Sequence, residues 1–454
     1  MYKSGRHIFV FAIAIILVTV FSLNIREHRV NAEETLPSLN ENKIVLKPGK
    51  KTRLSVLWDV KDYKVRWSSA DTSVATVSKK GKVTAVADGK TNVFAVVTYN
   101  EKTVKLKCRV IVESEKTVKL AAVGDALIHE NILNSGKQKD GSYNYDAIFE
   151  HMKDYLSGFD VKIINQETIF VYDSKKFGGY PSFGTPKEVG DAMRAAGFNV
   201  ITCATNHAYD RKEIGIQNTL DYWRKYKDSV LVTGIYGSQE DYDTLAIREY
   251  NGIKIAFLNY TTLLNSGAKK EPYYIRMYKE AAALKEIQAA KKKADFVIVL
   301  PHWGVEYEHE PSEKQEKMAK KLAEAGADAI IGCHPHVVQP VKVIKTSDGR
   351  RVPCYYSLGN FVSNMFWFKC QLEGLAELEI VKWNGETTLR AAEYTPIVNH
   401  MSKDDTKFTV YLLSDYTDAG DLYKDHYMNH RYWMGNVTPE RLKKLFNSLG
   451  NEKY

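Results

Sequence analysis

The segment GCHPHVVQP, Gly332 to Pro340, is the centre around which the chain is organised, because it follows an apolar run and carries two histidines one residue apart. Ala329-Ile330-Ile331 has the composition of a buried strand end, so His334 and His336 lie where this strand reaches solvent. Imidazoles at positions i and i+2, with a proline between them, can turn both rings toward one ion. The alternative is a plain pair of loop histidines, and the rest of the chain decides between the two.

Strands and helices alternate along the chain on both sides of this segment. Thr185-Pro186-Lys187-Glu188 has the pattern of a capping box with proline at the first helical position, and Ser312 with Gln315 predicts a second cap. The expected strands are Val118–Val123, Val161–Ile164, Phe198–Ala204, Ile253–Leu258, Phe296–Leu300, Ala329–Gly332 and Cys354–Ser357. This alternation predicts an α/β body over residues 118–400. Residues 401–454 are a C-terminal extension that ends in a helix capped by Thr438, and no function can be assigned to residues 400–437.

Residues 33–113 have a different pattern, in which short alternating segments are separated by Gly, Pro and Asn/Asp turns. This spacing without helical periodicity predicts a small all-β sandwich. Trp67-Ser68-Ser69, Val74-Ala75-Thr76-Val77 and Gly81-Lys82-Val83-Thr84-Ala85, followed by Gly89, resemble the bacterial Ig-like group 2 domain. The resemblance implies a surface module that serves as a spacer or adhesive unit.

Residues 1–32 combine Lys3 and Arg6 with the apolar run from residue 8 to 23 and a small-residue site that ends at Ala32. This pattern predicts export, either with a cleaved signal peptide or with an N-terminal membrane anchor, and hence an extracytoplasmic, cell-surface location. The chain of 454 residues carries a formal net charge of +9, but no run is dense enough for a nucleic-acid arm. We therefore expect an anionic surface polymer or anionic lipid as partner, and no nucleic acid. A plainly solvated basic surface is the alternative.

Potential metal ligands follow the strands of the α/β body, where the carboxyl ends of parallel strands share one edge of a sheet. They are Asp125, His129, Asn165, Glu167, Asn206, His207, Asp210, His302, Glu306, His334, His336 and Asn360. Oxygen and imidazole donors without thiolate suit one or two divalent ions such as Mn, Zn or Fe. Glu306 could instead orient His302, Asp125 could cap a helix, and Asn360 could be a turn residue after Gly359.

The motifs VGDALIH, NQET, TNHAYD, HWGVEY, GCHPHV and YSLGNF resemble, in this order, the CapA-type capsule synthesis proteins of poly-γ-glutamate systems, which are related to calcineurin-like metallophosphoesterases. The resemblance implies a four-layer αββα sandwich with a metal centre at the strand ends. It implies these metal ligands: Asp125, Glu167, Asn206, His302, His334 and His336. Leu127 stands where the broader phosphoesterase pattern has a histidine, so one ligand is missing from the two-ion pattern.

The leading hypothesis is an exported, metal-dependent hydrolase-like protein that acts in synthesis, attachment or release of poly-γ-glutamate or another anionic surface polymer. His207, oriented by Asp210, would protonate the leaving group of an amide or phosphoester. Apart from Arg211, no arginine stands near the motifs to clamp a phosphate. The alternatives are a non-catalytic tether that holds the polymer and an extracellular phosphoesterase. Whether membrane-bound synthase partners are needed stays open.

Overall fold

The computed structural model describes residues 35–267, 269–417, 422–431 and 436–454. The segment 1–32, for which we expect export or membrane anchorage, lies outside the described residues. Among the described residues, no helix has the length and apolar composition needed to span a bilayer. The chain divides into two compact units, the first ending at Val112 and the second running from Glu113 to Tyr454.

The first unit is a sandwich of β-sheets whose strands pair antiparallel, except for the parallel pair of β2 and β9. A four-stranded sheet, β2-β9-β8-β5, faces a three-stranded sheet, β3-β7-β6, and β1 pairs with β4. Val83 and Ala85 of the small sheet pack with Val93, Cys108 and Val110 of the large one, so the core lies between the sheets. The strands are β1 Ser38–Leu39, β2 Lys43–Leu46, β3 Lys51–Arg53, β4 Val56–Leu57, β5 Lys64–Ser69, β6 Ala75–Val77, β7 Lys82–Ala85, β8 Gly89–Tyr99 and β9 Lys102–Val112. The predicted all-β module is confirmed.

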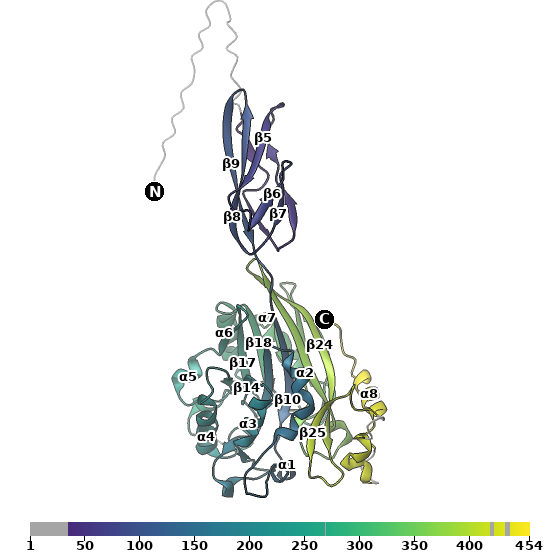
Figure 1. Cartoon of the computed structure of the whole chain (residues 1–454). Coiled ribbons are helices and arrows are strands. Elements are labelled where there is room, and N and C mark those ends of the chain that lie inside the picture. The colour runs from purple at the N-terminus through teal and green to yellow at the C-terminus, as the bar shows by residue number, and fades with distance from the viewer. Residues whose placement is uncertain (1–34, 268, 418–421, 432–435) are drawn as a thin grey trace, which may run out of the picture. The chain divides into compact units, whose positions relative to one another are not determined.

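The second unit contains two large sheets (Figure 1). In the first sheet, β10, β11, β14 and β15 are parallel, and β23, β24 and β25 extend it in antiparallel fashion. Its strands, in spatial order, are β15 Leu231–Thr233, β14 Val200–Thr202, β11 Val161–Gln166, β10 Lys116–Ala126, β23 Leu372–Trp383, β24 Glu386–Met401 and β25 Phe408–Leu412, while β22 Asn360–Val362 also pairs with β10. The parallel strands therefore end at one edge of the sheet.

The second sheet has the parallel strands β17, β18, β19 and β21 at its centre and an antiparallel strand at each edge. Its strands, in spatial order, are β16 Ile247–Tyr250, β17 Ile253–Thr261, β18 Phe296–His302, β19 Ala329–Ile331, β21 Arg351–Tyr355 and β20 Val341–Lys345. The short strands β12 Phe170–Val171 and β13 Thr185–Pro186 form a separate parallel pair.

Three apolar cores show that the second unit has four layers. One core is built from strand residues of both sheets, such as Leu120 and Ile163 from the first and Ile255 and Ile298 from the second. The outer face of the first sheet is covered by α1 (Glu130–Ser135), α2 (Lys153–Ser157), α3 (Glu188–Ala195) and α4 (Lys212–Arg224), and that of the second sheet by α6 (Glu280–Lys291) and α7 (Glu313–Ala325). This arrangement of helix, sheet, sheet and helix layers confirms the predicted αββα class.

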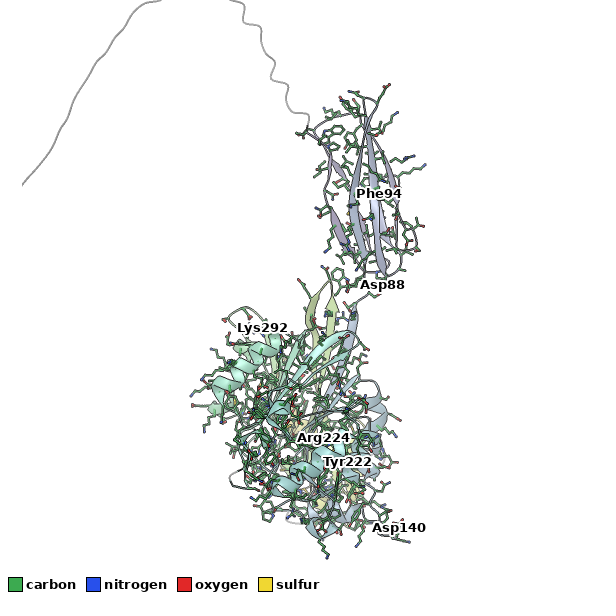
Figure 2. All side chains as sticks on the ribbon, turned by 90° about the vertical axis from the view of Figure 1, so that its left-hand side faces the viewer. Asp88, Phe94, Asp140, Tyr222, Arg224 and Lys292 are labelled. Carbon is green, nitrogen blue, oxygen red and sulfur yellow. The ribbon has the colours of Figure 1, made fainter. Side chains whose placement is uncertain are left out.

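The helices of the second unit lie on the outer faces of the two sheets (Figure 1). They are α1 Glu130–Ser135, α2 Lys153–Ser157, α3 Glu188–Ala195, α4 Lys212–Arg224, α5 Gln239–Asp243, α6 Glu280–Lys291, α7 Glu313–Ala325 and α8 Pro439–Ser448, with 3₁₀ turns at Asp146–Ile148, Glu150–Met152, Ser174–Lys176, Pro272–Tyr274, Phe368–Cys370, Leu422–Asp425 and Tyr427–His430. Figure 2 looks at this unit from another side and labels Tyr222 and Arg224 on α4 and Lys292 just after α6.

The two predicted helix caps have different outcomes. The capping box of Ser312 and Gln315 at the start of α7 is confirmed, with both reciprocal bonds present. The capping box at Thr185 is wrong, because Thr185 and Pro186 form β13 and α3 begins only at Glu188. The Thr185 hydroxyl instead donates a hydrogen bond of 2.7 Å to Thr168 Oγ1, so a tertiary contact replaces the local cap.

Candidate metal centre

The carboxyl ends of strands from both sheets supply the polar groups of the candidate site. Asp125 lies at the end of β10, Glu167 follows β11 and Asn206 follows β14. From the second sheet, His302 is the last residue of β18, and His334 and His336 follow β19. All six side chains are buried, with relative exposure of 3% or less. The two sheets therefore bring groups from distant parts of the chain into one buried site.

Glu167, His334 and His336 form the centre of this site. One ligand atom from each of these side chains lies within 4.8 Å of the other two. Both carboxylate oxygens of Glu167 and Nδ1 of His334 are buried and have no hydrogen-bond partner. Because an unpaired buried polar atom is costly, these atoms are suited to bind a group that the structure does not contain. Oxygen and imidazole donors fit a divalent cation.

His302 lies beside this group and is held through both ring nitrogens. Its Nε2 lies 2.7 Å from Asn206 Oδ1 and 3.7 Å from a Glu167 oxygen. Its Nδ1 lies 3.3 Å from the Asn165 amide. His302 and Asn206 therefore border Glu167 and are in a position to add ligands to the same ion.

Asp125 lies on the other side of the histidines from Glu167. Its carboxylate oxygens lie 3.8 Å from His302 Nδ1 and 3.5 Å from His336 Nδ1, whereas Glu167 faces the Nε2 atoms of both rings. The Asp125 carboxylate accepts hydrogen bonds from the Asn165 amide at 2.6 Å and from the backbone N–H of His334 at 3.1 Å. Asp125 and Asn165 thus position the histidine rings from their Nδ1 side, whereas Glu167 faces their Nε2 side.

Asn360 holds His336 in place. The Nδ1 of His336 lies 2.9 Å from Asn360 Oδ1, and the backbone N–H of Asn360 donates to Glu373 Oε2 at 2.7 Å. Asn360 is fully buried at the start of β22, so it is more than a turn residue after Gly359. Since Nδ1 of His336 is engaged by Asn360, Nε2 is the atom that faces Glu167.

His207 and Asp210 form a second pair next to this group. His207 Nδ1 lies 2.7 Å from Asp210 Oδ2, and both side chains are buried. Asp210 also accepts hydrogen bonds from the backbone N–H of Phe183 at 2.9 Å and from the Ser266 hydroxyl at 2.6 Å. This geometry fixes the His207 ring and leaves its Nε2 next to the Asn265 amide, 3.4 Å away. The pair is thus arranged as a carboxylate and an oriented imidazole.

Burial sets the pKa values of the site. It lowers the pKa of His334 to about 4 and the pKa values of His302 and His336 well below the usual range. Burial also raises the pKa of Asp125 to about 7 and that of Glu167 well above its usual range. The imidazoles are therefore neutral, as metal ligation requires, and a bound cation would stabilise the carboxylates in their charged form.

His334 and His336 both have a backbone conformation in the left-handed region, with φ of 102° and 57°. Non-glycine residues rarely adopt it, and such strain is concentrated at functional sites. The GCHPH segment is therefore held in a costly geometry that turns both rings into the site.

His129 and Glu306 lie in a cavity of about 510 Å³ next to the group rather than within it. His129 Nδ1 accepts the backbone N–H of Asn364 at 3.3 Å. Glu306 is exposed. The interpretation of Glu306 as the residue that orients His302 is wrong, because Asn165 and Asn206 occupy both ring nitrogens of His302.

Sequence reasoning missed several residues that support the site. Asn265 and Ser266 come from the loop after β17 and contact the His207–Asp210 pair, but no motif marks that loop. Glu373 is fully buried in β23 and contacts Asn360, and burial raises its pKa well above the usual range. The sequence holds no signal that distinguishes Glu373 from Glu377 and Glu379 in the same segment, LEGLAELEI.

Comparison with known families identifies the class of protein. The chain belongs to the bacterial capsule synthesis protein family PGA_cap, whose pattern matches residues 119–365. Residues 37–108 match the bacterial Ig-like domain, group 2. Both resemblances that the sequence motifs indicated are thereby confirmed.

Among particular proteins, the chain is similar to the capsule biosynthesis protein CapA of Bacillus anthracis, with 32% identity over 280 residues, which cover 59% of this chain and 65% of that protein. It is also similar to the PGA biosynthesis protein CapA of Bacillus subtilis (strain 168), with 29% identity over 291 residues, covering 63% and 73% of the two chains. The match thus spans just under two thirds of the Bacillus anthracis protein. A putative 5'-nucleotidase structure from Staphylococcus aureus superposes with a TM-score of 0.41 and 14% identity, over 62% of this chain and 54% of that one.

Proposed function

We propose that this protein is an exported, metal-dependent hydrolase that acts in the synthesis, attachment or release of capsular poly-γ-glutamate or a similar anionic surface polymer. The observation that carries the proposal is the buried group of Glu167, His334 and His336, whose ligand atoms converge, with both Glu167 oxygens and His334 Nδ1 lacking a hydrogen-bond partner. Membership in the capsule synthesis family and the similarity to the two CapA proteins support the biological role.

The residues that would hold one or two divalent ions are Glu167, His334 and His336, with His302 and Asn206 at their side. Once held by these residues, a divalent ion would supply Lewis-acid chemistry, polarising a carbonyl or phosphoryl oxygen and lowering the pKa of water. Because no thiolate is among these donors, Mn, Zn and Fe all suit the set.

His207 is the candidate proton donor to the leaving group. Asp210 accepts from its Nδ1, so Nε2 is the nitrogen that can exchange a proton with substrate. His207 and His336 line the same cavity, which supports a role for this nitrogen next to the proposed metal site. Asp210 in turn is fixed by Phe183 and Ser266, so the imidazole has one orientation.

The surface location is supported by the Ig-like unit and by the basic and apolar composition of residues 1–32. On this view the first unit is a spacer, and the second unit acts outside the cytoplasm, either anchored or released. The net charge of +9 favours association with an anionic polymer or lipid surface. Membrane-bound synthase partners would deliver the polymer.

Metal content and turnover of the full chain test this proposal. We expect the wild type and His151→Ala, an exposed histidine outside the site, to retain bound Mn, Zn or Fe by elemental analysis. His334→Ala and Glu167→Gln should lose most of that metal and the hydrolysis of poly-γ-glutamate together. Full metal content in His334→Ala would contradict the metal site. Polymer binding by a metal-loaded wild type without turnover would contradict the hydrolase and favour the tether.

A further inference from the structure

His207 and His336 line a cavity whose other lining residues have no role in the proposed function. Its volume is about 510 Å³, and aromatic side chains dominate its lining. Those from outside the metal group are Tyr180, Phe183, Tyr307, Phe366 and Trp367. Tyr180 and Trp367 are 77% and 50% exposed, so substrate can reach them from solvent. Large exposed aromatic side chains beside a buried polar site are typical of a recognition surface.

No lysine or arginine is among the described residues that line this cavity. Glu306 adds a negative charge to the lining. Arg211, the one arginine near the motifs, donates to the Ser182 carbonyl at 2.8 Å, and the Lys369 ammonium donates to the Tyr307 carbonyl at 2.6 Å. The wall therefore offers no bidentate cation for a phosphate and disfavours an anionic group in contact with it.

Tyr307 and Trp367 form the part of the wall that lies next to the metal group. Their rings meet edge to face with centroids 4.3 Å apart, and the Tyr307 ring lies 6.1 Å from that of His336. Tyr307 has φ of 67°, a strained conformation for a bulky residue. Its backbone N–H donates to the Pro335 carbonyl at 2.7 Å, within the HPH segment. Strain held in place beside a ligand histidine points to a functional role for this ring.

The loop that carries Trp367, residues 363–371, is held by the C-terminal part of the chain. Asn364 donates to Asp405 Oδ1 at 2.8 Å, and Asn399 donates to the Ser363 carbonyl at 2.8 Å. Asp405 also contacts Asn131 of α1. Asp405 thereby joins the loop to the segment that follows β10. Within the region 400–437, for which the sequence offered no role, Asp405 thus contacts the loop that lines the cavity.

We propose that Tyr307 and Trp367 form a joined aromatic surface, called the clamp below, against which the uncharged backbone of an amide-linked chain packs, and that Asp405 positions the loop bearing Trp367. The inference rests on the proposed hydrolase function and specifies its substrate class as an amide rather than a phosphoester. Aromatic faces pack against methylene groups and planar amides. A γ-linked polyglutamate offers both in its backbone, and its carboxylate branches remain in water.

The reaction at the clamped bond is amide hydrolysis. Water adds its oxygen to the carbonyl carbon, and the carbon–nitrogen bond breaks with its electron pair going to nitrogen. Both water protons end on that nitrogen, one of them through His207, and the products are a carboxylate and an ammonium group. No oxidant, reductant or further reactant is needed.

Steady-state kinetics of the metal-loaded full chain on poly-γ-glutamate test the clamp. Trp367→Ala should raise KM about tenfold or more with little change in kcat, whereas Trp367→Phe should stay within about threefold of wild type. Tyr172→Ala, an exposed aromatic outside the cavity, should behave as wild type. Metal content should be equal in all of these proteins. An unchanged KM in Trp367→Ala would overturn the clamp.

The positioning role is tested by variants at Asp405, where φ is 58° and glycine fits the backbone. Asp405→Gly should raise KM severalfold without metal loss, and Asp405→Asn should restore most of the wild-type KM because its oxygen still accepts from Asn364. Asp404→Gly, whose side chain contacts only Ser402 and Thr406, is the matched control. Equal KM values for Asp405→Gly and Asp404→Gly would overturn this role.

Two further results separate the clamp from the hydrolase proposal. A higher kcat/KM on bis(p-nitrophenyl) phosphate than on poly-γ-glutamate would overturn the amide assignment. If the wild type turns over neither probe, the hydrolase fails, and calorimetric binding of poly-γ-glutamate then tests the clamp alone. Weaker binding by Trp367→Ala supports the clamp, and equal binding overturns it.

Discussion

At the scale of single residues, the unpaired atoms of Glu167 and His334 are what define the site. A buried carboxylate without a hydrogen-bond partner is unfavourable, and so is a buried imidazole nitrogen without one. Their convergence with His336 within 4.8 Å means that one bound cation would satisfy all three groups. The neighbouring polar residues have their hydrogen bonds made and so position the ligands.

Asn360→Ala tests whether the contact of Asn360 with His336 contributes to metal affinity. Loss of the 2.9 Å contact to Nδ1 frees the His336 ring to rotate, so we expect metal affinity to fall about 10- to 100-fold. Competition with a chelator of known affinity measures this on the full chain. Asn144→Ala, an exposed asparagine, serves as the control. Equal affinities for the two variants would show that Asn360 does not orient the ligand.

The sequence predicted which residues gather at the strand ends, but not which of them would hold the cation and which position the ligands. Asp125, Glu167, His302, His334 and His336 were all found because each follows an apolar strand. Sequence position does not tell which nitrogen of a histidine faces which carboxylate. Asp125 lies on the Nδ1 side of the rings, and Asn360 contacts His336. Both arrangements depend on strand register and side-chain rotamers, which a sequence does not show.

At the scale of elements, the position of His334 depends on close packing at Gly332, directly after β19. A Cβ at Gly332 would lie 2.3 Å from the Tyr356 carbonyl oxygen and 2.4 Å from Trp303 Nε1. Since β19 ends at Ile331, any shift there moves the segment that carries His334. We therefore expect Gly332→Ala to lower the free energy of unfolding by about 2 kcal/mol and to weaken metal binding, as urea titration with and without metal would show.

An unchanged unfolding midpoint in Gly332→Ala would contradict this packing. Gly349→Ala is an imperfect but useful comparison, because its Cβ meets nothing within 4 Å while its φ of 86° adds strain alone. Only the Gly332 variant should weaken the metal site.

The C-terminal elements contain buried histidines that predict loss of stability in acid. Burial lowers the pKa of His400 to about 4 and that of His426 to about 3, whereas unfolded histidine titrates near 6.5. From about pH 8 upward both states are essentially neutral. As pH falls from there toward 4, only the unfolded chain gains protons, so stability decreases by up to about 1.4 kcal/mol per pH unit for each group.

His426→Asn isolates this effect. Asparagine can still accept the Met428 backbone N–H, which His426 Nδ1 accepts at 3.2 Å, but it does not titrate. Urea unfolding of the metal-free full chain at several pH values should therefore show a shallower acid dependence for His426→Asn. Parallel curves for the variant and the wild type would contradict the assignment.

Elements with strong local signals were predicted well from the sequence, and those that depend on tertiary contacts were not. The start of α7 has its own reciprocal cap, and α8 begins after the predicted Thr438 cap, which accepts from the Arg441 N–H. Thr185 had the same local pattern, but its pairing in β13 with β12 prevailed. Short strands such as β15 and β25 have no distinctive alternation and gain their order from neighbouring strands.

At the scale of the whole molecule, the division into two units predicts separate responses to metal. The candidate ligands all lie in the unit from Glu113 to Tyr454, and each unit has its own apolar core. Calorimetry of the full chain should show one transition that rises with added Mn or Zn and another that does not move. At a free metal concentration 100 times Kd, the bound unit gains about 2.7 kcal/mol. A metal-dependent shift of both transitions would contradict this separation.

Anomalous X-ray scattering from crystals of the metal-loaded full chain tests the central claim most directly. We expect a peak at the metal absorption edge about 2.0 to 2.3 Å from a Glu167 oxygen and from a nitrogen of both His334 and His336. A structure in which these three side chains surround no metal peak, while metal binds elsewhere or not at all, would contradict it.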